Sequence, residues 1–189
     1  ERLNLVKNIV EENHKTGDSL YVIVSAFGGV TDALIDITDK AKTNQSYKQG
    51  LKDFRSKVNK IADDLLSEGL YQTIKPDLEE NHNVLENLLS GVELIQEASV
   101  RTMDYILSFG ERNCAYILSH YLKQSGLSAE YVDARTLIST NSDFRSAKVI
   151  KDLSYKNIQS AFENKRGTTH IITGFIASDQ KGKTTTLGR

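Results

Sequence analysis

Near the start of the chain, apolar residues first follow helical spacing and then form a continuous run. Leu3 and Val6 belong to a helical pattern, and Gly17 is placed to end that helix. The run 20–25 that follows is short, apolar and rich in β-branched residues, which predicts a strand buried on both faces of a parallel sheet. A glycine-containing loop over 26–32 then leads back into helical spacing. Strand, loop and helix in this order predict an α/β unit.

The middle of the chain, residues 47–106, shows almost no strand signal. Apolar residues lie there on two helical faces, one formed by Phe54, Val58, Ile61 and Leu65 and the other by Leu78, Leu85, Leu88, Val92 and Ile95. This spacing predicts two long amphipathic helices packed as a hairpin and joined near Gly69 to Pro76. We interpret 47–106 as a helical insertion that leans on the α/β part of the domain.

The α/β pattern returns in the last third of the chain. The predicted elements are a helix over 111–124 ended by Gly126, short strands over 130–134 and 137–140, a helix capped by Ser154, a strand over 170–175 and β-favouring residues at 184–187. The whole chain therefore fits one α/β domain with an appended helical part.

The composition of the chain limits which ligands and binding partners are expected. Lys plus Arg (24) nearly cancel Asp plus Glu (25), for a net charge of −1, so the chain has no electrostatic footprint for nucleic acid or an acidic membrane. The single cysteine, Cys114, excludes an internal disulfide framework and a multi-cysteine zinc site. A reducing, cytoplasmic location is expected. Neither an apolar run long enough for a membrane span nor a secretory signal pattern is visible, and the four scattered histidines suggest no metal cluster.

Four segments combine glycine, hydroxyl and charged residues at the ends of predicted strands, where open parallel sheets bind ligands. In the first, 25–31, the paired Gly28 and Gly29 allow backbone N–H groups to approach an anion at the N-terminus of the next helix. The alternative is a tight strand-to-helix turn with Thr31 or Asp32 as the helix cap.

The second segment, 108–112, is predicted to open a helix. Glu111 then either holds a substrate ammonium group or only stabilises the helix N-terminus through the macrodipole. Cys114, one turn further on, is expected to be a small buried side chain, because no histidine is placed to activate it.

The third and fourth segments carry arginines. Asp133 and Arg135 form either a structural ion pair or part of a site. The stretch 174–189 ends in a threonine run followed by Gly188 and Arg189, and it reads equally as a polar hairpin or as a binder of a carboxylate or phosphate. No Walker A, dinucleotide, metalloprotease or nucleophile-elbow motif is present.

Taken together, these segments resemble aspartate kinases, members of the amino-acid kinase fold family. The matching stretches occur in order: 22–26 with 28–34, 108–112, 132–135, 173–177 and the closing Gly-Lys-Thr-Thr-Thr-Leu-Gly-Arg of 182–189. The resemblance implies a three-layer α/β/α sandwich with a mainly parallel sheet, in which residues 1–189 are part of a catalytic domain and 47–106 its helical insertion. It also implies ATP and Mg²⁺ as cofactors, L-aspartate as the acceptor, and a homo-oligomer.

The resemblance also assigns roles to individual residues. Thr31 is similar to a family residue near the aspartate substrate, Glu111 to the carboxylate that binds the substrate ammonium, and Arg189 to the guanidinium that binds its α-carboxylate. Ser25, Gly28 and Gly29 are expected to line the same cleft near the phosphates. Binding both charged ends of aspartate leaves its β-carboxylate facing the γ-phosphate of ATP.

Two family segments have no counterpart in the chain. A Lys-Phe-Gly-Gly-Thr-Ser segment, which supplies a phosphate-binding lysine, precedes the matched part in the family, and a Gly-Gly-Ser-Asp segment with a catalytic aspartate follows it. We therefore expect residues 1–189 alone to be inactive. Alternatives are a family member acting on another acceptor, such as glutamate, acetylglutamate or a nucleotide, and a non-catalytic module that only binds. Fusion to homoserine dehydrogenase and the identity of any inhibitor stay open.

Overall fold

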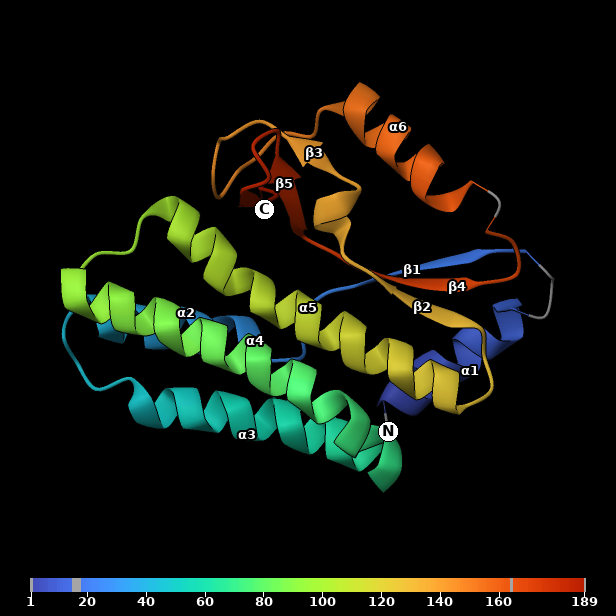
Figure 1. Ribbon diagram of the computed structural model, residues 1–189, viewed down its shortest axis with the longest axis horizontal. Helices are drawn as coiled ribbons and strands as arrows, with labels where there is room; N and C mark the ends of the chain where they lie inside the picture. Colours follow the sequence, from blue (N-terminus) through green and yellow to red (C-terminus); the bar gives the residue numbers. More distant parts are fainter. Residues whose placement is uncertain (1, 15–17, 164, 189) are drawn as a thin grey trace.

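The computed structural model describes residues 2–14, 18–163 and 165–188, in which helices and strands follow one another along the chain (Figure 1). The helices are α1 (Arg2–His14), α2 (Val30–Lys42), α3 (Lys48–Leu65), α4 (Glu68–Ile95), α5 (Val100–Gln124), the short 3-10 helix η1 (Ala134–Thr136) and α6 (Lys151–Phe162). The strands are β1 (Leu20–Val24), β2 (Ala129–Val132), β3 (Ser139–Thr140), β4 (Thr169–Thr173), β5 (Ile176–Asp179) and β6 (Thr184–Thr186). The predicted helix end at Gly17 lies outside the described residues.

Three parallel strands form the first sheet, in the order β1-β4-β2. All five residues of β4 are buried, as the apolar run in the sequence predicts for a central parallel strand. Val22 and Ile171 pair in register and belong to the core shared with α1 and α5, whereas Ile172 points to the other face and packs against α6. Helices, sheet and helix make three layers, which confirms the predicted α/β/α fold with a mainly parallel sheet (Figure 1).

A second, smaller sheet follows the first, in the order β3-β5-β6. Strand β5 runs parallel to β3 and antiparallel to β6, and the three threonines of β6 are buried. The hydroxyls of Thr140 and Thr185 lie 2.8 Å apart inside this sheet. The predicted β-structure at 184–187 is confirmed for 184–186.

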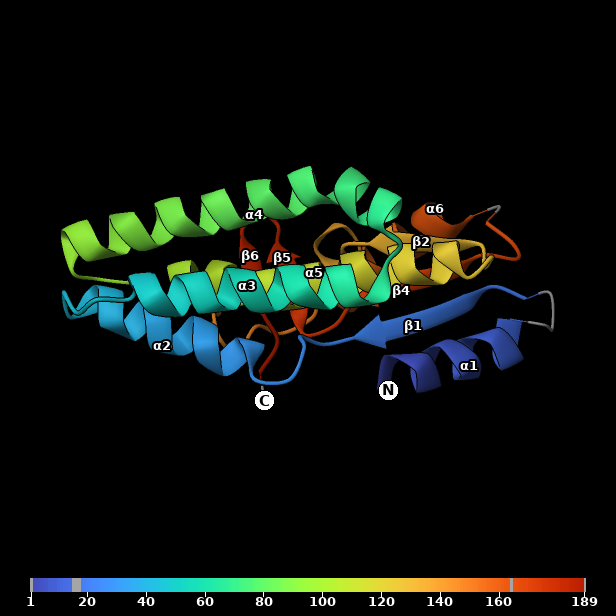
Figure 2. The same ribbon diagram turned by 90° about the horizontal axis from the view of Figure 1, so that it is seen from below.

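The helices α2, α3, α4 and α5 lie side by side beyond the first sheet (Figure 2). The predicted hairpin exists, but its turn lies at Leu66 and Ser67, so the predicted junction near Gly69 to Pro76 is wrong. Pro76 sits inside α4, where it removes one helical hydrogen bond at a cost of about 3 kcal/mol. Buried Ile74 and Leu78 on either side of Pro76 pack into the core and offset this cost. Whether 47–106 is an insertion relative to other family members stays a prediction.

Two predicted helix starts are also wrong. Helix α5 begins at Val100, where the hydroxyl of Ser99 accepts a hydrogen bond from the Thr102 N–H, so Glu111 is in the middle of the helix. Stabilisation of a helix N-terminus therefore does not explain Glu111. Ser154 is not a cap either. It lies within α6, and its hydroxyl accepts a hydrogen bond from the N–H of Ser139, which ties α6 to β3.

A buried histidine lies between α3 and α4. The side chain of His82 is 0% exposed and meets the ring of Phe54 edge-on at 5.8 Å. Its Nδ1 lies 3.9 Å from Glu79 Oε2, and neither ring nitrogen makes a hydrogen bond within the described residues. Burial lowers the pKa of His82 from 6.5 to about 4, although Glu79 partly opposes this shift.

We predict that His82 makes the stability of the helical part fall in weak acid. Since the unfolded histidine takes up a proton near pH 6.5 and the folded one only near pH 4, its contribution is complete above pH 6.5 and decreases as the pH falls below it. Between pH 7.5 and pH 5 the loss should be about 2 kcal/mol. Urea unfolding of the 189-residue chain at both pH values, compared with the His82→Phe variant, measures it.

The variant should lose less stability than the unsubstituted chain over this pH range, by the amount that His82 contributes. His120 and His170 also have lowered pKa values because of burial and are present in both proteins, so the difference isolates His82. Equal pH dependence of the two proteins would show that His82 is not held neutral.

Candidate functional site

The ends of β1 and β4 lie next to each other and form one side of the candidate site. Val24 pairs with Thr173, and the N–H of Gly174 donates to the carbonyl of Val24 at 2.7 Å. A side chain at Gly174 would lie 3.1 Å from that same carbonyl oxygen, a close contact that glycine avoids. The loop after β1 and the turn after β4 therefore meet at the carboxyl edge of the sheet, where the sequence predicted a site.

The glycine loop leads directly into α2. Gly29, with φ of 75°, is the N-cap of this helix and makes no side-chain cap, so the alternative of Thr31 or Asp32 as the cap is wrong. Ser25, Gly28 and Gly29 are exposed, and Thr31 is half-buried in the first turn. The first-turn amides of a helix have no partner within the helix and attract anions.

Sequence reasoning missed a lysine at this loop. Lys57, from α3, donates from Nζ to the carbonyl oxygen of Gly28 at 2.6 Å. It is 29 residues away along the chain, and nothing in its local sequence connects it with the glycine pair. The contact brings one positive charge to the exposed loop.

Gly110 allows α5 to lie directly against the glycine loop. A Cβ at Gly110 would lie 2.8 Å from the Cβ of Ala26 and 3.3 Å from Cγ1 of Val30. No real pair of side chains tolerates the first distance, so α5 and the loop approach as closely as they do because residue 110 is glycine. The next residue along the helix is Glu111.

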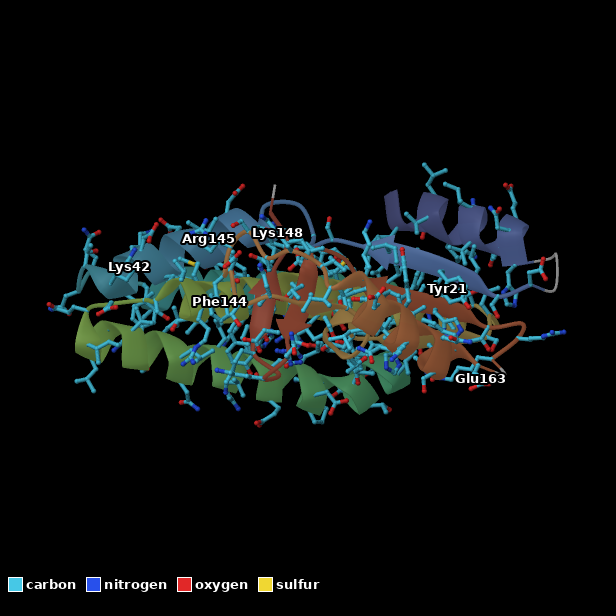
Figure 3. The ribbon with its side chains drawn as sticks, turned by 90° about the horizontal axis from the view of Figure 1, so that it is seen from above. Tyr21, Lys42, Phe144, Arg145, Lys148 and Glu163 are labelled. Atoms are coloured by element: carbon cyan, nitrogen blue, oxygen red, sulfur yellow. The ribbon has the colours of Figure 1, made fainter. Side chains whose placement is uncertain are left out.

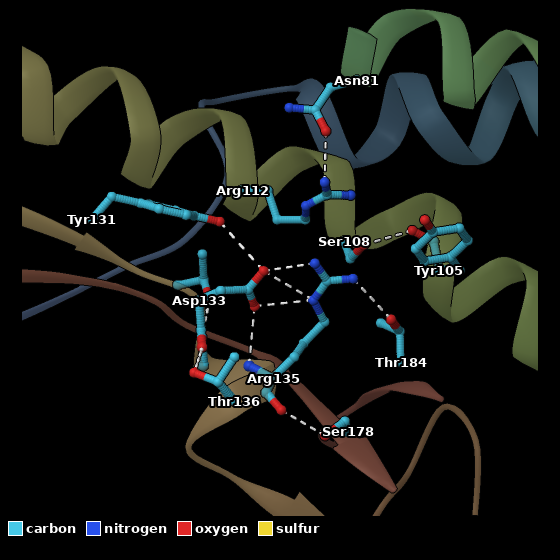
Figure 4. Close-up of polar contacts among 12 residues, drawn as sticks. Asn81, Tyr105, Ser108, Arg112, Tyr131, Asp133, Arg135, Thr136, Ser178 and Thr184 are labelled. Carbon is cyan, nitrogen blue, oxygen red and sulfur yellow. Dashed lines mark hydrogen bonds and ion pairs between the residues drawn. The ribbon is translucent and has the colours of Figure 1, made fainter. Parts of the chain in front are cut away.

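Glu111 is almost fully buried, with 3% of its surface exposed. Cys114 and Arg112 are its neighbours on α5. Cys114 is buried, and burial together with the charge of Glu111 raises the pKa of its thiol to about 12, as expected for an inert side chain. Arg112 points elsewhere: its Nη2 donates to Asn81 on α4 at 2.6 Å (Figure 4).

A cavity of about 190 Å³ opens beside this part of α5. Its lining comprises Ile35 from α2, Leu107 from α5, Arg145 and Phe175. Leu107 is one helical turn before Glu111, and Phe175, with φ of 64°, follows Gly174 at the end of β4. The cavity is therefore bounded by the same helices and strand end that carry the predicted residues. Arg189 lies outside the described residues, so its predicted role stays a prediction.

Asp133 and Arg135 form the predicted ion pair, and whether they also belong to a site stays a prediction. Arg135 Nη2 lies 2.6 Å from Asp133 Oδ2, and Arg135 Nη1 donates to the hydroxyl of Thr184 at 3.1 Å (Figure 4). Burial alone would raise the pKa of Asp133, but the hydrogen bonds and charge of Arg135 outweigh it and hold that pKa below its ordinary value. The pair ties the end of β2 to β6.

In 2–14, 18–163 and 165–188, no group of three or more His, Cys, Asp or Glu side chains is arranged to hold a metal ion. The helices of these same ranges include none with the length and apolar character needed to cross a bilayer.

Comparison with known proteins gives one family. A profile described as the Amino acid kinase family matches residues 1–189. The chain is 29% identical over 192 residues to a chloroplastic bifunctional aspartokinase/homoserine dehydrogenase of Daucus carota, covering 100% of this chain and 20% of that protein. It is 27% identical over 177 residues to the chloroplastic Aspartokinase 2 of Arabidopsis thaliana, covering 89% of this chain and 31% of that protein. The chain thus spans between about a fifth and a third of these relatives.

Solved structures share the fold. Aspartokinase III of E. coli in complex with lysine and aspartate superposes with a TM-score of 0.84 at 22% identity, covering 99% of this chain and 40% of that one. The same enzyme in complex with aspartate and ADP gives a TM-score of 0.79, again at 22% identity. At this identity the similarity establishes the fold.

We predict that Gly110→Ala destabilises the chain by about 1–3 kcal/mol, because the new methyl group overpacks against Ala26. Replacing Ala26 by glycine in the same protein should restore part of the loss, since it removes the closest atom. Gly91→Ala is the control: nothing lies within 4 Å of that position in α4, so alanine should stabilise the helix by about 0.5–1 kcal/mol. Urea unfolding measures all three, and equal effects at Gly110 and Gly91 would contradict the close packing.

Proposed function

The chain belongs to the amino acid kinase family, and from this premise we propose that the protein phosphorylates the β-carboxylate of L-aspartate with ATP. Its relatives are named aspartokinases and bifunctional aspartokinase/homoserine dehydrogenases, and the solved aspartokinase III complexes contain aspartate and, in one case, ADP. The product, an acyl phosphate of aspartate, fits the start of lysine, threonine and methionine biosynthesis.

The observation that supports this proposal most directly is the place of Glu111. Glu111 is 3% exposed in the middle of α5, one turn from a cavity of about 190 Å³ and one residue from the contact with the glycine loop. A substrate ammonium bound by Glu111, with Thr31 nearby, orients the acceptor so that its side-chain carboxylate faces the phosphates.

The glycine loop supports phosphate binding. Gly28 and Gly29 are exposed at the N-terminus of α2, whose first-turn amides and positive dipole end favour an anion, and Lys57 adds a charge at the same loop. These groups fit the phosphates of a nucleotide, with exposed Ser25 beside them. A dedicated magnesium site is absent from the described residues, and Mg²⁺ usually binds through substrate phosphates with few protein ligands.

Other properties of the whole protein stay proposals. We keep the prediction of a homo-oligomer. A reducing compartment such as the cytoplasm fits the buried thiol of Cys114. The named plant relatives are chloroplastic.

We predict that the full-length gene product releases ADP in an aspartate-dependent manner, and that Glu111→Gln lowers kcat/KM for aspartate by about 10²-fold or more. The loss follows because the variant keeps the volume of the side chain and removes the charge that pairs with the ammonium. Coupled ADP-release assays with aspartate, with glutamate and without an acceptor measure both effects.

Glu97→Gln provides the control, since it removes an exposed carboxylate just before α5. It should leave kcat/KM within about twofold of the unsubstituted protein, as exposed charges contribute little. Turnover with glutamate alone would replace the acceptor in the proposal. A folded protein that binds aspartate and shows no turnover with any acceptor would favour the non-catalytic alternative.

A further inference from the structure

Asp104 is a fully buried carboxylate that the sequence analysis did not single out. It precedes Glu111 by seven residues in α5, which is two helical turns or about 10 Å, so the two acidic side chains lie on the same face of the helix. A buried carboxylate is stabilised only where donors satisfy its oxygens. Asp104 has three such donors, from two distant segments.

The donors come from the turn after β3 and from β6. Asp104 Oδ2 accepts from the N–H of Arg145 and from the N–H of Thr186, each at 2.9 Å. Asp104 Oδ1 accepts from the hydroxyl of Thr186 at 2.7 Å. Hydrogen bonds to an ionised acceptor are stronger than neutral ones, so this carboxylate holds both segments against α5.

The backbone of Arg145 is in an unfavourable conformation that this contact supports. Its φ is 70°, in the left-handed region that costs an L-residue other than glycine free energy. The same turn is joined to β6 by the hydrogen bond from Ala147 N–H to the Thr186 carbonyl at 3.1 Å. The Asp104 contact and this bond together fix the turn on β6.

Arg145 is exposed and is one of the residues that line the cavity next to Leu107, one helical turn before Glu111. Arg145 lies next to α2 (Figure 3) and lines the cavity of about 190 Å³ with Ile35, Leu107 and Phe175. No ion pair joins Arg145 to another residue of the described ranges 2–14, 18–163 and 165–188. The cavity therefore presents a guanidinium to a carboxylate-bearing ligand.

We propose that Asp104 is a positioning residue and Arg145 a substrate-binding residue: Asp104 fixes the turn so that Arg145 faces the acceptor pocket and binds a carboxylate of the acceptor. This inference rests on the proposed function for the identity of the acceptor. It adds one cation to the pocket and explains why a non-glycine residue is held at a positive φ there. Glu111 and Arg145 then meet opposite charges of an acidic amino acid.

Four variants of the full-length gene product test the proposal by steady-state kinetics. Arg145→Gly retains the N–H that Asp104 binds, relieves the positive φ and removes the guanidinium, so KM for aspartate should rise on the order of 10-fold without a lower Tm. Asp104→Asn should raise it as well, with a total loss in kcat/KM on the order of 10²-fold if the turn shifts by about 1 Å. KM for ATP should stay within about twofold in both.

Two substitutions of Thr186 test the contact between Asp104 and β6 from the other side. Thr186→Ser keeps the hydroxyl donor and should retain the unsubstituted KM for aspartate, whereas Thr186→Val loses that donor and should raise it. If Asp104→Asn fails to fold, this pair and Arg145→Gly still decide the proposal.

An unchanged KM for aspartate in Arg145→Gly would overturn the role of Arg145. Equal increases in KM for aspartate and for ATP in Asp104→Asn and Thr186→Val would reduce Asp104 to a fold-stabilising residue and overturn its positioning role. Absence of aspartate-dependent turnover in the unsubstituted protein would instead defeat the proposed function, and with it the assignment of the acceptor. Amide hydrogen exchange at Arg145 and Thr186 distinguishes these cases, because it should accelerate in Asp104→Asn whatever the substrate is.

Discussion

The close approach of α5 to the loop after β1 is the constraint on which the rest of the site depends. A methyl group at Gly110 would lie 2.8 Å from Ala26, so the helix and the loop can touch only through the glycine. This contact fixes the height and rotation of a 25-residue helix against the carboxyl ends of β1 and β4. Glu111 follows Gly110 directly along α5 and is almost fully buried.

The same helix organises the pocket through its charged residues. Asp104 and Glu111 lie on one face of α5: Asp104 accepts from backbone and hydroxyl donors, and Leu107, one turn before Glu111, lines a cavity. Asp104 therefore fixes protein segments, whereas a ligand role for Glu111 stays a prediction. The Asp133–Arg135 pair joins the end of β2 to β6 through Thr184. Strand β6 is therefore bonded both to α5, through Asp104, and to the end of β2. These contacts tie β6 and the turn that carries Arg145 to α5 and to the end of β2.

The strand β4 could be predicted from the sequence because a buried parallel strand is a continuous β-branched run. Strand β1 also forms as predicted, but Tyr21 and Ile23 are exposed, so its predicted burial on both faces is wrong. The start of α5 and the course of α4 could not, since Gly110, Gly69 and Pro76 look like helix breaks and only tertiary packing shows why each is tolerated. Glu111 and the glycine loop were singled out from glycine and charged residues at predicted strand ends, and the roles that the family resemblance gives them stay predictions. Asp104 was missed because its partners Arg145 and Thr186 are 41 and 82 residues away, and local spacing carries no sign of such pairing.

A crystal structure of the full-length gene product with L-aspartate would test the central claim most directly. The account predicts that the amino acid lies between the glycine loop and Phe175, with its ammonium within about 3 Å of a carboxylate oxygen of Glu111. Aspartate bound at another place, or bound here with its ammonium turned away from Glu111, would contradict it.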